Sequence, residues 1–297
     1  MWLKILNILL FLSIYSFGQI SDQSADKYFQ KNDEKDNQLK VLSWNIYMLP
    51  ANAFRFSSPI KRSKKIVEEL LQKDYDVVCF QELFHKRAEK IITEGLREKF
   101  PFQLASSDKT GFIHTNSGLW IFSKYPIIKI NELVFNDCLG SDCMARKGAL
   151  LVELSFFGNK IQLINTHLQS GRKGDRDKIR LLQTEQIYSD FKLSSNNVIQ
   201  LLCGDFNTSS ELQKNQMLSI LKAIDGKLYG EKQYSWPSFD YYNGYSTLLD
   251  YIFLRNKIDF VEIERKILEI NSSWKKKCKS NSSLSDHLSV EAIIKFN

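Results

Sequence analysis

Residues 148–168 read GALLVELSFFGNKIQLINTHL, two apolar segments joined by Gly158-Asn159. Each segment is rich in aliphatic residues, and a glycine-asparagine pair between two such segments is a strong short-range hairpin signal. The stretch therefore predicts two antiparallel strands joined by a tight turn. A sheet that contains this hairpin cannot be purely parallel.

Strand-like and helix-like segments alternate on both sides of the hairpin. Residues 76–83 and 198–207 are short continuous apolar runs, as expected of strands covered on both faces. Further strands are predicted at residues 40–49, 117–127, 248–255 and 289–296. Apolar residues at helical spacing predict helices at residues 60–73, 85–100 and 177–191. The predicted fold is α/β (α+β in some schemes): a four-layer sandwich of two packed mixed β-sheets with helices on the outer faces.

The N-terminal residues 1–18 have the layout of a secretory signal peptide: a basic residue, an apolar run, then Ser16 and Gly18 as a small-x-small cleavage site. The run is shorter than the roughly 20 residues that span a membrane, and an uncleaved anchor or a buried strand is the alternative. Residues 19–38 are polar and charged, which predicts a flexible leader. No linker follows, so residues 39–297 are predicted to form one domain of a secreted protein.

The chain carries a formal net charge of +7, which becomes +6 without the single lysine of the predicted signal peptide. A basic exported protein suits an anionic partner such as a phospholipid surface or a nucleic acid. Lysine-rich helices that only aid solubility would give the same charge, so charge alone does not choose between these readings.

The five cysteines fall into three groups. Cys79 and Cys203 lie within apolar runs and are predicted to be buried thiols. Cys138 and Cys143 bracket the short loop CLGSDC, which an oxidising compartment could close as a local disulfide. Cys278 lies among lysines and is predicted to be a free, exposed thiol.

Polar residues recur at the ends or beginnings of predicted buried strands. Rigid strand ends are where a sheet presents functional groups to a shared crevice. Each residue alone has a plain structural reading, such as a solvated strand end or a tight turn; their joint occurrence on separate strands favours a functional site. The residues are Asn45, Glu82, His167, Asp205, Asn207, Asp250, Asp286 and His287.

Most of these side chains are oxygen donors, and no cysteine-histidine cluster accompanies them. Hard oxygen ligands suit Mg²⁺ or Mn²⁺ and fit zinc poorly. Such an ion keeps positions open for phosphate oxygens, and two histidines beside it can transfer protons and bind phosphate. The combination predicts a metal-dependent enzyme that hydrolyses a phosphoester.

From residue 41 onward the ordered set resembles the endonuclease/exonuclease/phosphatase superfamily of metal-dependent phosphodiesterases, whose fold is DNase I-like. The narrower resemblance is to the bacterial neutral sphingomyelinases. It is carried by WNIYMLP at residues 44–50, by the CLGSDC loop followed by RKGAL, and by NTHLQS at residues 165–170. The cysteine-bracketed loop resembles the disulfide of the secreted sphingomyelinases.

The resemblance implies a role for each residue. Glu82 matches the principal metal ligand, with Asn45 beside it. Asp205 and Asn207 match the pair that orients the attacking water and the phosphate. His167 matches the histidine that contacts the scissile phosphate or the leaving oxygen. His287 matches the general base, and Asp250 the carboxylate that holds its imidazole; Asp286 matches a further residue at or near the metal. The predicted metal set is Asn45, Glu82, Asp205, Asn207, Asp286 and His287.

The implied reaction is hydrolysis of sphingomyelin to ceramide and phosphocholine, with Mg²⁺ as cofactor and Mn²⁺ or Co²⁺ as substitutes. The implied partner is a sphingomyelin-containing membrane surface, with a lysophospholipid as an alternative substrate. We expect a monomer that does not bind nucleic acid. Two alternatives stay open: a secreted nuclease of the same fold, and a catalytically silent membrane-binding relative.

Two segments depart from the resemblance or extend it. Where the secreted family has an apolar membrane-dipping hairpin, this chain offers Trp274 followed by three lysines. Trp274 is the predicted membrane contact, against the alternative of a basic surface loop. A second aromatic segment could form a choline-binding wall or a nucleobase platform, although packing is the reading we favour for most of its members. Its residues are Tyr234, Trp236, Phe239, Tyr241, Tyr242 and Tyr245.

Overall fold

The computed structural model describes residues 37–50, 58–107, 115–172, 174–195, 197–237, 245–256, 261–276 and 279–296. These residues belong to one compact unit. The predicted signal peptide, nearly all of the predicted leader, Cys278 and the aromatic residues 239, 241 and 242 lie outside them. Within the described part, no helix is both long enough and apolar enough to cross a lipid bilayer.

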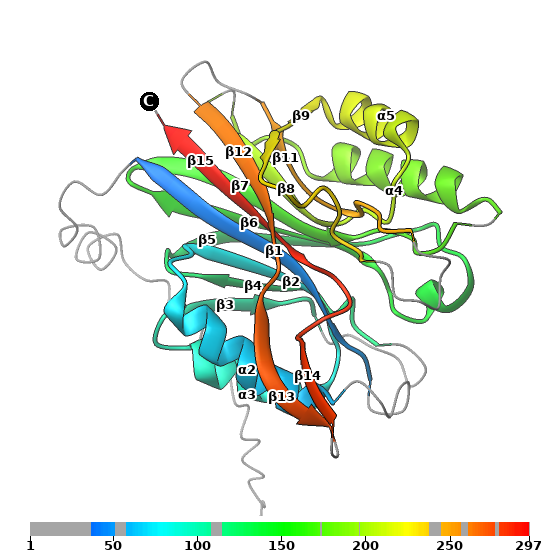
Figure 1. The fold of residues 1–297 in the computed structure, drawn as a ribbon. Coiled ribbons are helices and arrows are strands. Elements are labelled where there is room, and N and C mark those ends of the chain that lie inside the picture. The colour runs from blue at the N-terminus through cyan, green and yellow to red at the C-terminus, as the bar shows by residue number, and fades with distance from the viewer. Residues whose placement is uncertain are drawn as a thin grey trace, which may run out of the picture. The chain divides into compact units, whose positions relative to one another are not determined.

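The first sheet is mixed and has seven strands in the order β10-β12-β15-β1-β2-β4-β3. The central strand β1 pairs in parallel with β2 and antiparallel with β15, so the last strand of the chain lies beside the first (Figure 1). In sheet order, the strands span Lys227–Tyr229, Val261–Leu268, Ser289–Phe296, Gln38–Met48, Val77–Leu83, Trp120–Ser123 and Phe102–Ala105.

The second sheet is also mixed and has six strands in the order β5-β6-β7-β8-β11-β9. In that order they span Ile127–Val134, Gly148–Phe156, Asn159–His167, Ile199–Asp205, Asp250–Arg255 and Ala223–Asp225. The predicted hairpin is β6–β7, but its turn lies one residue earlier than predicted. Phe157 and Gly158 occupy the turn with φ of 45° and 78°, and Asn159 already pairs with Phe156. Two positive φ values match the twist of a tight hairpin.

Helices cover the outer face of each sheet. Helices α2 (Pro59–Gln72) and α3 (Lys86–Leu96) share an apolar cluster with β1 and β2 of the first sheet. Helices α4 (Arg176–Asp190) and α5 (Glu211–Leu221) share another with β7, β8 and β11 of the second. The predicted four-layer sandwich is therefore confirmed.

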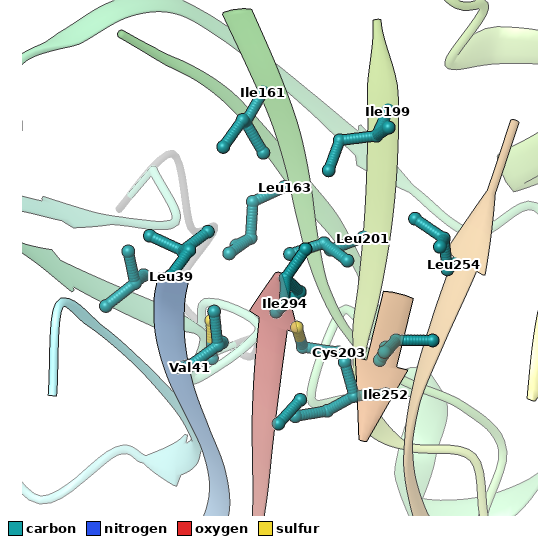
Figure 2. Packing of buried hydrophobic residues seen from close by; sticks show 14 of the residues in the cluster. Leu39, Val41, Ile161, Leu163, Ile199, Leu201, Cys203, Ile252, Leu254 and Ile294 are labelled. Carbon is teal, nitrogen blue, oxygen red and sulfur yellow. The ribbon is translucent and has the colours of Figure 1, made fainter. Parts of the chain in front are cut away.

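The two inner faces pack against each other through a third apolar cluster. Leu39 and Val41 of β1 meet Leu163 of β7 and Leu201 of β8, and all four side chains are fully buried (Figure 2). Burying one such aliphatic side chain contributes about 1.5–3 kcal/mol. This cluster fixes the distance between the sheets, and with it the distance between the strand ends that carry the predicted site.

Three small elements complete the chain. The 3₁₀ turn η1 (Gly140–Cys143) lies inside the cysteine-bracketed loop. Strands β13 (Asn271–Lys276) and β14 (Lys279–Ser283) form a separate two-stranded hairpin near helix α2.

Candidate metal-dependent hydrolase site

Three adjacent strands of the second sheet align three of the predicted residues. His167 at the end of β7 pairs in register with Asp205 at the end of β8, and Asp205 pairs with Asp250 at the start of β11. The first sheet contributes Asn45 from β1 and Glu82 from β2. The Asn45 amide nitrogen lies 3.1 Å from Oε1 of Glu82 and 3.1 Å from Oδ2 of Asp205. Asn45 thus joins the ends of the two sheets.

His287 and Asp250 form a hydrogen-bonded pair next to this junction. The His287 Nδ1 atom lies 2.8 Å from Asp250 Oδ2, and its Nε2 atom lies 3.8 Å from Asp205 Oδ2. The Ser235 hydroxyl donates to the same Asp250 oxygen at 2.5 Å and accepts the backbone N–H groups of Leu249 and Asp250 at 3.0 Å each. The carboxylate therefore fixes Nδ1 as the protonated nitrogen and turns Nε2 toward the site.

Burial and neighbouring carboxylates shift two pKa values in this cluster. Burial raises the pKa of Glu82 to about 7, and the nearby Asp286 adds to the rise. Burial lowers the pKa of His287, but Asp250 and Asp205 outweigh it and hold that pKa well above its usual value. Among the described residues, Oε2 of Glu82 has no hydrogen-bond partner. Buried carboxylate oxygens whose negative charge is balanced by few hydrogen bonds fit a cation site.

Two arrangements of donors could hold the cation. Ligand atoms of Asp205, Asp250 and His287 lie within 4.8 Å of one another. Oδ2 of Asp250 is already bonded to His287 and Ser235, whereas its Oδ1 has no hydrogen-bond partner among the described residues. The other predicted oxygen donors, on Asn45, Glu82, Asp205, Asn207 and Asp286, have the hard character that Mg²⁺ prefers. Oδ1 of Asn45 accepts the N–H of Tyr47 at 3.2 Å. The contacts associate Asp250 with His287, and the set of metal ligands stays a prediction.

The backbone is strained where these groups are presented. Tyr47, Glu82 and Asn207 have φ of 49°, 59° and 53°, in the left-handed region that such residues seldom adopt. Each such backbone conformation costs about 1–3 kcal/mol and persists only where the surrounding contacts stabilise it. Asn207 is held by its N–H to Asp205 Oδ1 at 2.9 Å and by its amide nitrogen to Leu168 O at 3.1 Å. The strain marks the strand ends that carry the site.

Lys147, for which no role was predicted, lies inside the site. Its side chain is buried, with Nζ 2.9 Å from Nε2 of His167, 3.0 Å from Oδ2 of Asp142 and 2.7 Å from the carbonyl of Leu168. Burial and this ammonium group lower the pKa of His167 to about 3. The imidazole is therefore neutral and accepts a hydrogen bond from Lys147. The sequence contained one sign of this role: Lys147 directly precedes a predicted buried strand, in the RKGAL motif.

Arg62 of α2 is the second buried cation without a predicted role. It donates to the carbonyls of Ile46 at 2.8 Å, Leu284 at 2.6 Å and Tyr47 at 2.5 Å. These carbonyls belong to the segments that carry Asn45 and Asp286, so the guanidinium fixes both segments to the helix. Burial lowers its pKa to about 10, which leaves it charged. In the sequence it is one cation among several on a basic helix, and nothing sets it apart.

The predicted cysteine states agree with the structure where it describes them. Cys138 and Cys143 form a disulfide with their Cα atoms 5.2 Å apart, and the thiols of Cys79 and Cys203 are buried. Gln169, two residues after His167, fixes the disulfide loop to the site: its Oε1 accepts the N–H of Leu139 at 2.7 Å, and its Nε2 donates to Asp142 Oδ2 at 3.0 Å.

Trp274, the predicted membrane contact, is half-buried. It packs against the cluster under α2, and its indole N–H donates to the carbonyl of Ser283 at 2.9 Å. In the aromatic segment, Tyr234 packs against the central core, Trp236 pairs with Thr247, and Tyr245 is exposed. Neither membrane contact nor choline binding follows from these positions, and both stay predictions.

The model of the Endonuclease/Exonuclease/phosphatase family matches residues 42–287, which include every predicted metal and proton-transfer residue. The chain belongs to this family. Among curated relatives of this family member, sphingomyelinase C 2 of Leptospira interrogans is 29% identical, with 77% of this chain and 43% of that protein covered. Phospholipase C of Staphylococcus aureus is also 29% identical, with 84% and 83% covered. The chain thus spans less than half the length of the Leptospira protein.

Solved structures support the same fold for this family member. The crystal structure of a beta toxin from Staphylococcus aureus superposes with a TM-score of 0.79 at 24% identity, covering 86% of this chain and 99% of the toxin. A mutant of that toxin with bound magnesium ions gives a TM-score of 0.78. The DNase I-like architecture expected from the sequence is therefore the one this chain adopts.

Proposed function

We propose that this protein is a secreted, Mg²⁺-dependent phosphodiesterase that hydrolyses sphingomyelin to ceramide and phosphocholine. The observation that carries the proposal is the oxygen cluster of Asn45, Glu82 and Asp205, with the His287–Asp250 pair directed at it. The names of the sphingomyelinase and phospholipase C relatives favour the lipid substrate. The disulfide supports export, because disulfides persist in oxidising compartments.

Glu82 and Asp286, with Asn45 and Asp205 beside them, would hold the cation, which supplies Lewis-acid stabilisation of charge on the phosphate oxygens. His287 accepts a proton from the attacking water through Nε2 while Asp250 holds Nδ1–H. Asp250 raises the His287 pKa most, followed by Asp205 and Asp286; a cation beside Asp205 and Asp286 would offset their effect and so favour the neutral imidazole that a base requires. The new bond joins the water oxygen to phosphorus, and the bond to the ceramide oxygen breaks; that oxygen takes up a proton from solvent, and His287 releases to solvent the proton it accepted.

Lys147 and His167 belong to the phosphate side of the site in this proposal. Lys147 donates hydrogen bonds and carries positive charge, and the neutral His167 accepts one of those bonds. The three N–H bonds of Lys147 are directed to His167, Leu168 and Asp142, so its contribution would be its positive charge, held beside the negative charge that builds on phosphate oxygens in the transition state. Water can be excluded from such a buried pair when lipid enters, which strengthens the interaction.

The test is a parallel assay on sphingomyelin, lysophosphatidylcholine and double-stranded DNA, each with Mg²⁺ and with EDTA. We expect phosphocholine release from sphingomyelin that EDTA abolishes. His287→Ala, checked for folding by its thermal unfolding curve, should lower turnover about 10²–10⁴-fold. Nicked DNA without phosphocholine release would favour the nuclease alternative. No product from any substrate would favour the silent membrane-binding relative, and near-normal turnover of His287→Ala would refute the assignment of the base.

A further inference from the structure

We propose that the disulfide loop and the arginines beside it form the surface through which this protein docks on a phospholipid bilayer. This docking surface consists of Val134, Leu139, Met144, Arg146, Arg172 and Arg176. The inference rests on the proposed function, because a lipid phosphodiesterase must draw its substrate from a membrane that lies against the mouth of its site.

Large apolar side chains are exposed on the disulfide loop and at the end of the neighbouring strand. Leu139 and Met144, which flank the 3₁₀ turn of the loop, are 39% and 52% exposed, and Val134 at the end of β5 is 37% exposed. Val134 lines one cavity of about 220 Å³ together with Cys143 and Arg146, so the loop and the strand end are contiguous. Single exposed apolar residues are ordinary, but a contiguous group of them marks a surface that meets a partner.

The backbone under these side chains is fixed. Leu139 donates its N–H to Gln169 at 2.7 Å and accepts from the same amide at 3.1 Å. Met144 donates its N–H to Ser141 and accepts from the N–H of Thr115, each at 3.1 Å. The disulfide and these hydrogen bonds hold the loop backbone in place before it meets a membrane. Docking therefore requires no further ordering of the loop, and little conformational entropy is lost.

Two arginines adjoin the apolar tips. Arg172 and Arg176 line a cavity of about 420 Å³ with Leu139 and Ser141. Arg172 is exposed, and its Nη2 donates to Thr247 at 3.2 Å. Arg176 lies close to Gly171, where an added Cβ would be 2.8 Å from its Nε, and near Gly140, where an added Cβ would be 3.9 Å from its Nη2.

This mixture of groups matches the interface of a lipid bilayer. Guanidinium groups recognise phosphate oxygens, and apolar side chains beside cations are the pattern of proteins that bind at the headgroup layer. A layer of phospholipid headgroups fits both the arginines and the apolar side chains. Its phosphates would contact the arginines, and the boundary between headgroups and acyl chains would lie at Leu139 and Met144.

The docking surface borders the catalytic residues. Asp142 in the same loop lies 3.0 Å from Lys147, which lies 2.9 Å from His167. A bilayer on this surface would therefore present headgroups next to the proposed phosphate site. The β13–β14 hairpin is the competing location, but the Trp274 ring is packed against the protein and its N–H is bonded to Ser283.

The test compares a double variant, Leu139→Ser with Met144→Ser, with a matched control, Leu71→Ser with Leu212→Ser. The control removes two exposed leucines of α2 and α5 that lie outside the docking surface. Co-sedimentation with sphingomyelin–phosphatidylcholine vesicles is measured in EDTA, so that no lipid is consumed. We expect vesicle affinity to fall at least tenfold in the double variant and to stay within twofold of wild type in the control.

Hydrogen exchange on the wild-type protein with and without vesicles locates the contact independently. Protection of residues 137–147 and 169–177 supports the docking surface, whereas protection confined to residues 269–284 overturns it. Unchanged vesicle affinity in the double variant, or no binding of the wild type to vesicles, also overturns it. Vesicle binding that depends on Leu139 and Met144, without any sphingomyelin hydrolysis by the wild type, would refute the proposed function and leave the docking surface standing.

Discussion

The ammonium group of Lys147 lies 2.9 Å from Nε2 of His167, and it carries the positive charge of this pair because burial and the lysine together lower the pKa of the imidazole to about 3. The positive charge at this point of the site is thus a lysine, held by Asp142 at 3.0 Å. Removing it should change both the chemistry of the site and the titration of the histidine.

Lys147→Met should lower kcat on sphingomyelin at least about tenfold, because it removes a buried positive charge beside the proposed phosphate side of the site. The pKa of His167 should rise, since the lysine is one of the groups that lower it. Steady-state kinetics and an NMR titration of the imidazole measure the two effects. Lys160→Met, at an exposed lysine near the far end of β7, is the control. An unchanged His167 pKa would contradict the observed contact whatever the substrate.

Ser235→Ala removes the hydroxyl that donates to Asp250 and accepts two backbone N–H groups. A buried group left without its partner costs about 1–3 kcal/mol, so the free energy of unfolding should fall by that amount. Turnover should fall more than in Ser189→Ala, whose hydroxyl is exposed on α4. Urea unfolding and kinetics of both variants give the comparison. Equal turnover in the two variants would mean that Ser235 does not position the His287–Asp250 pair.

Mg²⁺ should raise the melting temperature more at pH 8 than at pH 5.5. The raised pKa of Glu82, about 7, means that at pH 5.5 a cation must displace a proton from this carboxyl. Without metal, the folded state holds that proton to a higher pH than the unfolded state does, so stability relative to Glu82→Gln should fall as pH rises toward 8. Differential scanning calorimetry measures both. A Mg²⁺ effect that does not change with pH would exclude Glu82 as a ligand.

Gly204→Ala should prevent folding or destabilise the protein by more than about 3 kcal/mol. Gly204 precedes Asp205 with a φ of 155°, and an added Cβ would lie 2.0 Å from the carbonyl oxygen of Thr166 on β7. Gly158→Ala is the matched control, because its φ is also positive while the space around it is open; its cost should be about 1 kcal/mol. Thermal unfolding separates the two. Similar melting temperatures would show that β7 and β8 can move apart.

Several parts of the fold with strong periodicity were predicted correctly, although the alternating strand β12 was missed. Buried strands such as β2 and β8 and amphipathic helices such as α2 have patterns that burial itself imposes. Helix α5 was not predicted, because its apolar residues do not form one clear face and Leu212 is exposed. The short strands β9 and β10 contain only three residues each, too few for a pattern. The hairpin turn was placed one residue late because Phe157, rather than glycine, takes the first positive φ.

The residues of the site also divide into those that the sequence could reveal and those that it could not. Polar residues at the ends of apolar strands could be recognised in the sequence, and the structure brings Asn45, Glu82, Asp205, Asp250 and His287 together. Lys147 had a sign in the sequence, its place directly before a predicted buried strand, which was not used; Arg62 could not be recognised, because its role depends on burial and on partners far away in the chain. Arg62, for example, binds a carbonyl 222 positions later. Local sequence carries no information on such a contact.

The pairing of β15 with β1 has a consequence for biosynthesis. The ladder joins residues 38–43 to residues 290–295, so the first strand gains this neighbour only after residues 44–289 have been synthesised. Contacts of such large sequence separation form slowly, because closing a long loop costs entropy before the contacts stabilise the fold. Asp286 and His287 directly precede β15. A chain truncated before residue 286 would therefore have no assembled centre and no hydrolytic activity.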